Sequence, residues 1–131
     1  MKEARWQELE AAVRQVDDVD LIVTAAQQLQ DEATHEDAPR LRALLEDASF
    51  VVREAAAFPL AYLLGPACLR DLLLAQIKGT RDGHDNDTLN AAIGEVLSLD
   101  EAGSRAMLAE LKHDPDPALV AAAASCEDYW A

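Results

Sequence analysis

Residue types that could carry chemistry gather in the polar connecting segments of this chain. Each of the three histidines is followed directly by an acid, giving His35-Glu36, His84-Asp85 and His113-Asp114. The segment 79–87, GTRDGHDND, contains further carboxylates that could offer oxygen ligands to calcium. It lacks the glycine and the closing glutamate that an EF-hand loop needs at fixed positions. We therefore predict no metal site and no cofactor, and we interpret the histidines as polar loop residues.

The sequence shows no arrangement typical of nucleophilic catalysis. It has no G-x-S-x-G segment, no phosphate-binding P-loop and no C-x-x-C pair. Ser98, Ser104 and Ser125 have no histidine at a fixed helical offset to act as a base. Cys68 and Cys126 lie in apolar surroundings typical of reduced core thiols in a cytoplasmic protein. We therefore predict a cytoplasmic protein that is not an enzyme.

The formal net charge of −14 restricts the partners that the chain can bind. It comes from 25 acids against 11 bases. Nucleic acids and anionic membranes draw their affinity from lysine and arginine, so the charge argues against both. The N-terminal residues form no apolar run, and no segment reaches the roughly 18 apolar residues of a membrane span. A basic protein partner, reached by electrostatic attraction, is the partner that this charge favours.

Acidic residues are concentrated in the short segments between expected helices. Helix N-termini prefer acids in any protein, and this preference accounts for part of the pattern. The remaining excess predicts an acidic ridge on the surface. The residues that we predict to bind the partner are Asp47, Asp82, Asp85, Asp87, Asp114 and Asp116.

Helices must position these acids, and residues 41–64 show how. Leu41, Leu44 and Leu45 recur at helical spacing, which indicates a short amphipathic helix. A polar break at 46–49 follows, and a second apolar face begins at Val52. Few β-branched residues alternate anywhere in the chain, so we expect no sheet.

The same two-helix pattern recurs along the chain. Aligning the second helices on Leu21, Val52, Leu89 and Leu119 gives spacings of 31, 37 and 30 residues. The approximate units are 1–34, 35–64, 65–99 and 100–131, which together make one all-α domain. We expect eight helices in four antiparallel pairs, with the longest loop at 79–87.

The segment LLEDASFVVREAA resembles a HEAT repeat of the short form called PBS-lyase-like. In that family an aspartate near the turn and an arginine early in the second helix form a ladder between repeats. Asp47 and Arg53 stand at the matching positions. The resemblance implies a short right-handed α-solenoid of about four HEAT-like hairpins, in which the turns lie along one edge.

The resemblance and the charge leave two functional hypotheses. The first is an acidic immunity protein of HEAT-like form, which neutralises a basic bacterial toxin such as a nuclease or deaminase. The alternative is a HEAT-repeat scaffold or assembly factor of the phycobilin-lyase-like group. A diiron HEAT-repeat enzyme resembling deoxyhypusine hydroxylase is disfavoured, because only His35-Glu36 matches its His-Glu ligand pairs.

Overall fold

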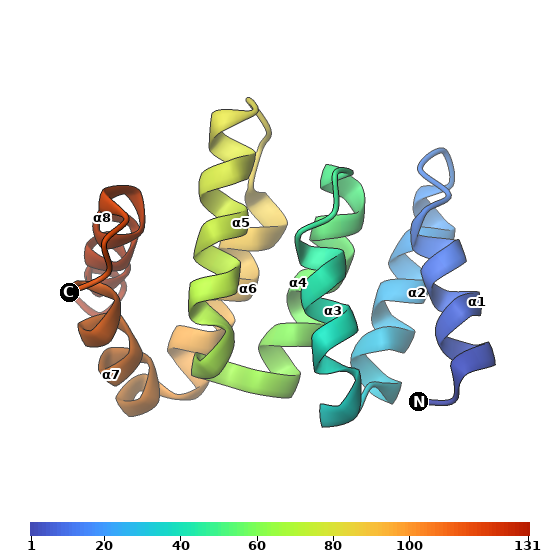
Figure 1. Ribbon diagram of the computed structural model, residues 1–131, viewed down its shortest axis with the longest axis horizontal. Helices are drawn as coiled ribbons and strands as arrows, with labels where there is room; N and C mark the ends of the chain where they lie inside the picture. The colour runs from blue at the N-terminus through green and yellow to red at the C-terminus, as the bar shows by residue number, and fades with distance from the viewer. The chain divides into compact units, whose positions relative to one another are not determined.

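A computed structural model describes the whole chain, Met1–Ala131, and shows an all-helical protein (Figure 1). Helix accounts for 81% of the residues and there is no strand, so the all-α prediction is confirmed. The chain divides into two compact units, Met1–Leu64 and Gly65–Ala131. The prediction of one domain made of four repeated units stays a prediction. Each of the two compact units is described separately below.

The elements follow one another with short connections. Unit 1 contains α1 (Glu3–Val13), α2 (Val19–Glu32), the 3₁₀ turn η1 (His35–Asp37), α3 (Ala38–Leu45) and α4 (Phe50–Leu64). Unit 2 contains the 3₁₀ turn η2 (Gly65–Cys68), α5 (Leu69–Arg81), α6 (Asp87–Leu99), α7 (Glu101–Leu111), α8 (Pro117–Cys126) and the 3₁₀ turn η3 (Glu127–Trp130).

The prediction of eight separate helices is wrong, because the structure has seven. Residues Phe50–Arg81 form one uninterrupted helical segment, in which α4, η2 and α5 follow directly on each other. Counting this segment as a single helix gives seven, although α4 and α5 keep separate labels. The predicted boundary between the units 35–64 and 65–99 falls at Gly65, where two separate helices were expected to meet. Gly65 does adopt the left-handed φ of +56° typical of a helix C-terminus. The chain nevertheless enters the η2 turn at once, so no non-helical residue separates the two helices.

Unit 1 is held together by contacts of α1 with α2, α2 with α4, and α3 with α4 (Figure 1). Its α2 helix buries Ile22, Ala25 and Leu29, which recur at the spacing of one helical stripe. The alignment of the second helices on Leu21 implies that Leu21 faces the core, and this is wrong: its exposed fraction is 39%, against 8% for Ile22. One residue turns the side chain by about 100° around a helix, which is enough to move it off the buried stripe.

Unit 2 is packed around α5. This helix contacts α6, α7 and α8, and η2 contacts α6 and α7. Leu89 and Leu119, on which the later second helices were aligned, are fully buried in this core. Val52, the corresponding residue of unit 1, is almost fully buried. The helix α5 continues to Arg81, so the connection to α6 is shorter than the predicted loop 79–87.

Both cysteines are free thiols, and they differ in exposure. Cys68 is buried, whereas Cys126 is partly exposed. Burial raises the pKa of the Cys126 thiol above its ordinary value. The buried position of Cys68 agrees with the core role that its apolar surroundings predicted.

The segment Phe50–Arg81 is long and apolar enough to cross a membrane by length and composition alone. An 18-residue window within it has a mean hydropathy of 1.4. Of that window, 44% is buried inside the protein, and core helices of soluble proteins meet the same criterion. The absence of a membrane partner therefore stays a prediction.

Candidate functional site: the acidic turns

Three of the helix-connecting turns share one local structure. An aspartate oxygen accepts a hydrogen bond from the backbone N–H two residues later, at the start of the next helix. The three donor–acceptor distances are 2.8 Å for Ser49 N to Asp47, 3.2 Å for Asp87 N to Asp85, and 2.9 Å for Asp116 N to Asp114. These Asx turns precede α4, α6 and α8. An aspartate followed two residues later by Ser or Asp is visible in the sequence at all three turns, but the same pattern at Asp18 and Asp20 gives a hydrogen bond from Leu21 N to Asp18 instead.

Asp47 is only partly available to a partner. Its carboxylate accepts the Ser49 N–H and forms an ion pair with Arg14 at the end of α1, at 2.9 Å. The hydrogen bond from Ser49, with a further contribution from Arg14, holds the pKa of Asp47 below its ordinary value. Its side chain is 20% exposed. Asp47 thus joins the α3–α4 turn to α1, and its charge is largely balanced within unit 1.

Arg53 contacts the same turn through the backbone. Its Nη1 donates hydrogen bonds to the carbonyl oxygens of Asp47, at 2.8 Å, and Ala48, at 3.1 Å. The guanidinium also lies 5.4 Å from the centre of the Phe50 ring. The side chain is buried, and its Nε and Nη2 atoms have no hydrogen-bond partner. At the two positions that match the repeat ladder, Arg53 thus contacts the carbonyl oxygens of Asp47 and Ala48, while the Asp47 carboxylate is bound by Arg14.

The α5–α6 turn presents two carboxylates that have no basic partner. Asp85 and Asp87 are both exposed, and Asp85 raises the pKa of Asp87 through a hydrogen bond and charge repulsion. Asn86 lies between them and is buried. Its Nδ2 donates to the carbonyl of Gln76 at 3.1 Å and to Thr80 Oγ1 at 2.8 Å. This buried amide fixes the turn, so the two carboxylates are held close together despite their repulsion.

Asp82, at the start of this turn, is less isolated. Lys78 Nζ lies 4.0 Å from its carboxylate, one helical turn earlier in α5. Both side chains are exposed, and an ion pair of this kind contributes little to stability.

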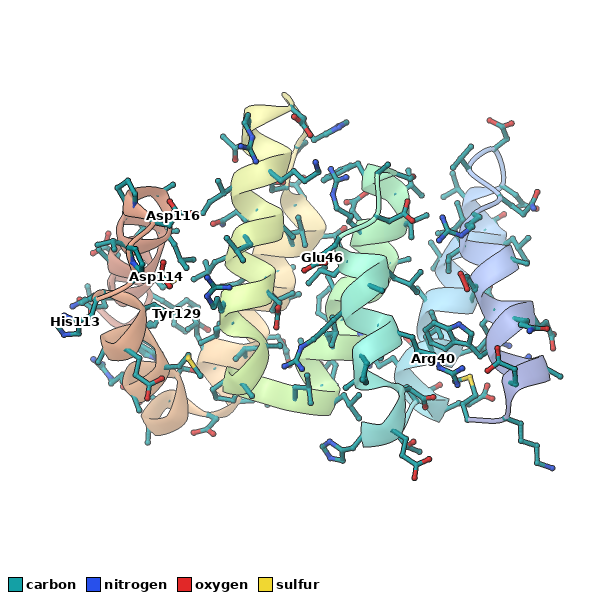
Figure 2. All side chains as sticks on the ribbon, in the orientation of Figure 1. Arg40, Glu46, His113, Asp114, Asp116 and Tyr129 are labelled. Atoms are coloured by element: carbon teal, nitrogen blue, oxygen red, sulfur yellow. The ribbon has the colours of Figure 1, made fainter.

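The α7–α8 turn supplies the remaining predicted residues (Figure 2). Asp114 has a side chain only 16% exposed and lies 3.5 Å from Arg70. Asp116 is exposed, and its carboxylate caps α8 by accepting the N–H of Ala118 at 2.9 Å. Of this pair, Asp116 is the one that presents its charge to solvent.

The two acidic turns of unit 2 lie near different parts of α5. Arg70, which contacts Asp114, is the second residue of α5, whereas Asp82 follows the last residue of that helix. The two positions are 12 residues apart in sequence, which corresponds to about 18 Å along a helix axis. The structure brings the Asp85 and Asp87 carboxylates close enough to interact, and it joins Asp114 to Asp116 through the hydrogen bond of the Asx turn. Whether any of the six residues binds a partner stays a prediction.

Acids within the protein already bind most of its bases. Ion pairs join Arg5 to Glu8 and Glu32, Arg14 to Glu10 and Asp47, Arg40 to Glu3 and Asp37, Arg70 to Asp114, Lys78 to Asp82, Arg105 to Glu101, and Lys112 to Glu127. Arg40 and Arg105 also lie over tryptophan rings, Trp6 and Trp130, at 4.3 and 4.4 Å (Figure 2 labels Arg40). Because the bases are paired internally, the surplus charge at the surface is carboxylate.

The structure shows no grouping of metal-ligating side chains. Nowhere do three or more His, Cys, Asp or Glu residues come together in a way that could hold an ion. The three histidines are exposed: His35 in η1, His84 in the α5–α6 turn, and His113 after α7. What the α5–α6 and α7–α8 turns present to solvent is the negative charge of Asp85, Asp87 and Asp116.

Comparison with known proteins identifies no relative of this chain. No family model matches the chain, and neither the curated proteins nor the solved structures give a match.

Proposed function

We propose that this chain is an acidic, non-enzymatic binding protein that neutralises a basic protein partner. A bacterial toxin with a basic cleft, such as a nuclease or deaminase, is the partner class that fits the proposal. The observation that carries it is the separation of charge: internal ion pairs occupy most bases, while Asp85, Asp87 and Asp116 are exposed without a base.

The finer fold proposal is a short right-handed α-solenoid of HEAT-like hairpins. In unit 1, α1 pairs with α2, α3 pairs with α4, and the two second helices α2 and α4 contact each other. The recurrent Asx turn before α4, α6 and α8 supports a repeated unit. Unit 2 departs from this pattern, because α5 contacts α8 as well as α6.

Electrostatics would act mainly on the rate of encounter. Exposed like charges that are not neutralised locally attract an oppositely charged surface and raise the association rate. The attraction is screened beyond about 8 Å at physiological ionic strength, so the association rate should fall as salt is added. A field of this sign also disfavours acidic competitors, which gives selectivity before any close contact forms.

The test is binding kinetics against a panel of basic nuclease and deaminase toxin domains, with neutral proteins as the reference. Asp85→Asn combined with Asp87→Asn removes two charges and keeps an oxygen that can accept the turn hydrogen bond. The matched control is Asp31→Asn combined with Glu36→Gln, two exposed acids outside the acidic turns.

We expect the turn variant to slow association and to reduce its salt dependence, with the melting temperature nearly unchanged. The control should bind like the wild type, and toxin activity should fall on binding. If no basic toxin domain binds, or if binding is indifferent to both the turn variant and salt, the proposal is wrong.

A further inference from the structure

Unit 1 contains a groove that its own core does not fill. It lies between α1 and α2 and has a volume of about 330 Å³. Its floor is apolar and its edge is polar. The apolar lining residues are Leu9, Ala11, Ala12, Leu21 and Ala25, and the polar ones are Glu8, Gln15 and Gln28.

Small side chains and helical spacing together create this groove. On α1, residues 8, 11 and 12 lie at helical spacing, and residue 15 follows the end of this helix; on α2, residues 21, 25 and 28 share one helical face. Ala12 and Ala25 leave the space between the helices unfilled. Leu21 stands at the edge, 39% exposed, because the buried stripe of α2 runs through Ile22 instead. The groove is therefore a preformed apolar surface beside the core.

Negative charge surrounds the end of the groove at the α1–α2 turn. Asp17 and Asp20 are exposed there and form no ion pair. Asp18 is also exposed, and its carboxylate caps α2 by accepting the N–H of Leu21 at 3.1 Å. Arg14, the base closest to this turn in the sequence, is already bound by Glu10 and, at 2.9 Å, by Asp47. This end of the groove is thus acidic without a counter-charge.

At the opposite end of the groove the charge is balanced. Arg5 Nη1 lies 3.0 Å from Glu8, and Arg5 Nη2 lies 2.6 Å from Glu32. An occupant would therefore meet free carboxylates only at the end near the α1–α2 turn. This difference between the two ends would orient the occupant along the groove.

We infer that this groove binds an amphipathic helix of a partner protein, with a large apolar side chain in the groove and lysine or arginine at the acidic end. A helix laid into a groove between two helices is a recurrent mode of recognition, in which apolar anchors at helical spacing give most of the affinity. Charge complementarity sets the sign of the partner. A second copy of this chain would bring another net charge of −14 to the same surface and is disfavoured by repulsion.

This inference goes beyond the proposed function and does not depend on it. The groove lies in unit 1, whereas the unpaired carboxylates of the α5–α6 and α7–α8 turns lie in unit 2. The two sites can therefore fail independently when tested.

The probes are synthetic helical peptides, used with the full chain. One carries leucine at helical spacing with lysine elsewhere. A second replaces each lysine by glutamate, and a third keeps the lysines but scrambles the leucine spacing. Fluorescence anisotropy gives the dissociation constants, and backbone amide NMR shifts locate the bound peptide.

Two variants test the groove itself. Leu21→Gln removes the apolar edge without changing charge, and Ala12→Phe fills the space. The matched control is Leu99→Gln, a leucine that is 62% exposed in unit 2. The double variant Asp17→Asn and Asp20→Asn tests the acidic end of the groove. Its control is the double variant Asp85→Asn and Asp87→Asn, which removes two charges from unit 2. Thermal melts establish that each variant is folded, and Leu21→Gln remains informative should Ala12→Phe not fold.

We expect the leucine–lysine peptide alone to bind, shifting the amides of Leu9, Ala12 and Leu21. Leu21→Gln and Ala12→Phe should each raise the dissociation constant of this peptide about tenfold or more, as the loss of an apolar anchor does. Leu99→Gln and the Asp85/Asp87 variant should leave the affinity unchanged. Equal binding of the glutamate or scrambled peptide, or no effect of Leu21→Gln, would overturn the inference. Concentration-dependent dimerisation abolished by Ala12→Phe would also overturn it, because a second copy would then be the occupant.

Discussion

Asp37 is a buried carboxylate whose stabilising effect depends on pH in a predictable way. Its side chain is 2% exposed. It accepts hydrogen bonds from Thr34 N at 2.8 Å, Arg40 Nη2 at 2.7 Å, Arg40 Nε at 3.2 Å and the ammonium of Met1 at 3.2 Å. These contacts join η1 to α3 and to the N-terminal segment. Replacing Asp37 by asparagine keeps the size of the side chain but removes its charge and turns an amide towards several donors.

The magnitude follows from the pKa of Asp37. Burial is the largest influence and by itself would raise the pKa, but the hydrogen bonds from Thr34, Arg40 and the ammonium together outweigh it. The pKa falls from 3.8 to about 2. A shift of this size corresponds to about 2 kcal/mol of folding free energy. Because the folded pKa lies below the unfolded one, the stabilisation is complete above pH 3.8 and is lost as the pH falls towards 2.

Urea unfolding of the wild type and Asp37→Asn at several pH values tests this reasoning. At pH 7 the variant should be less stable by about 2 kcal/mol or slightly more, because unpaired donors add to the lost charge interaction. The difference should shrink steadily below pH 4. Glu36→Gln, which changes the exposed neighbouring acid, is the control and should cost under about 0.5 kcal/mol. A difference that is the same at pH 7 and near pH 2 would refute the assignment of the stabilisation to the ionised carboxylate.

Three further predictions follow from the packing and the turns. Val52→Ala should destabilise the protein by about 1–3 kcal/mol in urea unfolding, and Leu21→Ala by clearly less, because only Val52 is fully buried; equal costs would contradict the observed α2 stripe. Asp85→Asn should lower the pKa of Asp87 towards its ordinary value in an NMR titration, since Asp85 is what raises it; an unchanged titration would mean that the two carboxylates do not interact. Thermal melts with and without a chelator should coincide, and a midpoint lowered by the chelator would show that the 79–87 segment had been misread as metal-free.

Local patterns in the sequence determined that the chain is helical and where most of its helices begin. Helical spacing and capping act over three or four residues, so a window of sequence contains the information. Val52, Leu89 and Leu119 were identified as buried in this way, and all three are. The polar break predicted at 46–49 does separate α3 from α4, whereas the predicted loop 79–87 is too long, because α5 continues to Arg81.

Leu21 shows where the local sequence pattern was not sufficient to identify the buried residue. Leu21 and Ile22 are both apolar and adjacent, so the pattern alone cannot say which of them faces the core. The contacts of α2 with α1 and α4 select the stripe through Ile22. That choice leaves Leu21 at the edge of the α1–α2 groove.

The acidic residues show most clearly what only tertiary structure decides. The sequence by itself determined the surplus of acids and their place in the turns. It could not tell which of them would be neutralised, because the partners are distant in the chain: Arg14 binds Asp47 and Arg70 approaches Asp114 only after the helices pack. Asp85 and Asp87 have no such partner. Charge is a property of composition, but the charge that remains exposed depends on which side chains the fold brings within about 4 Å of each other.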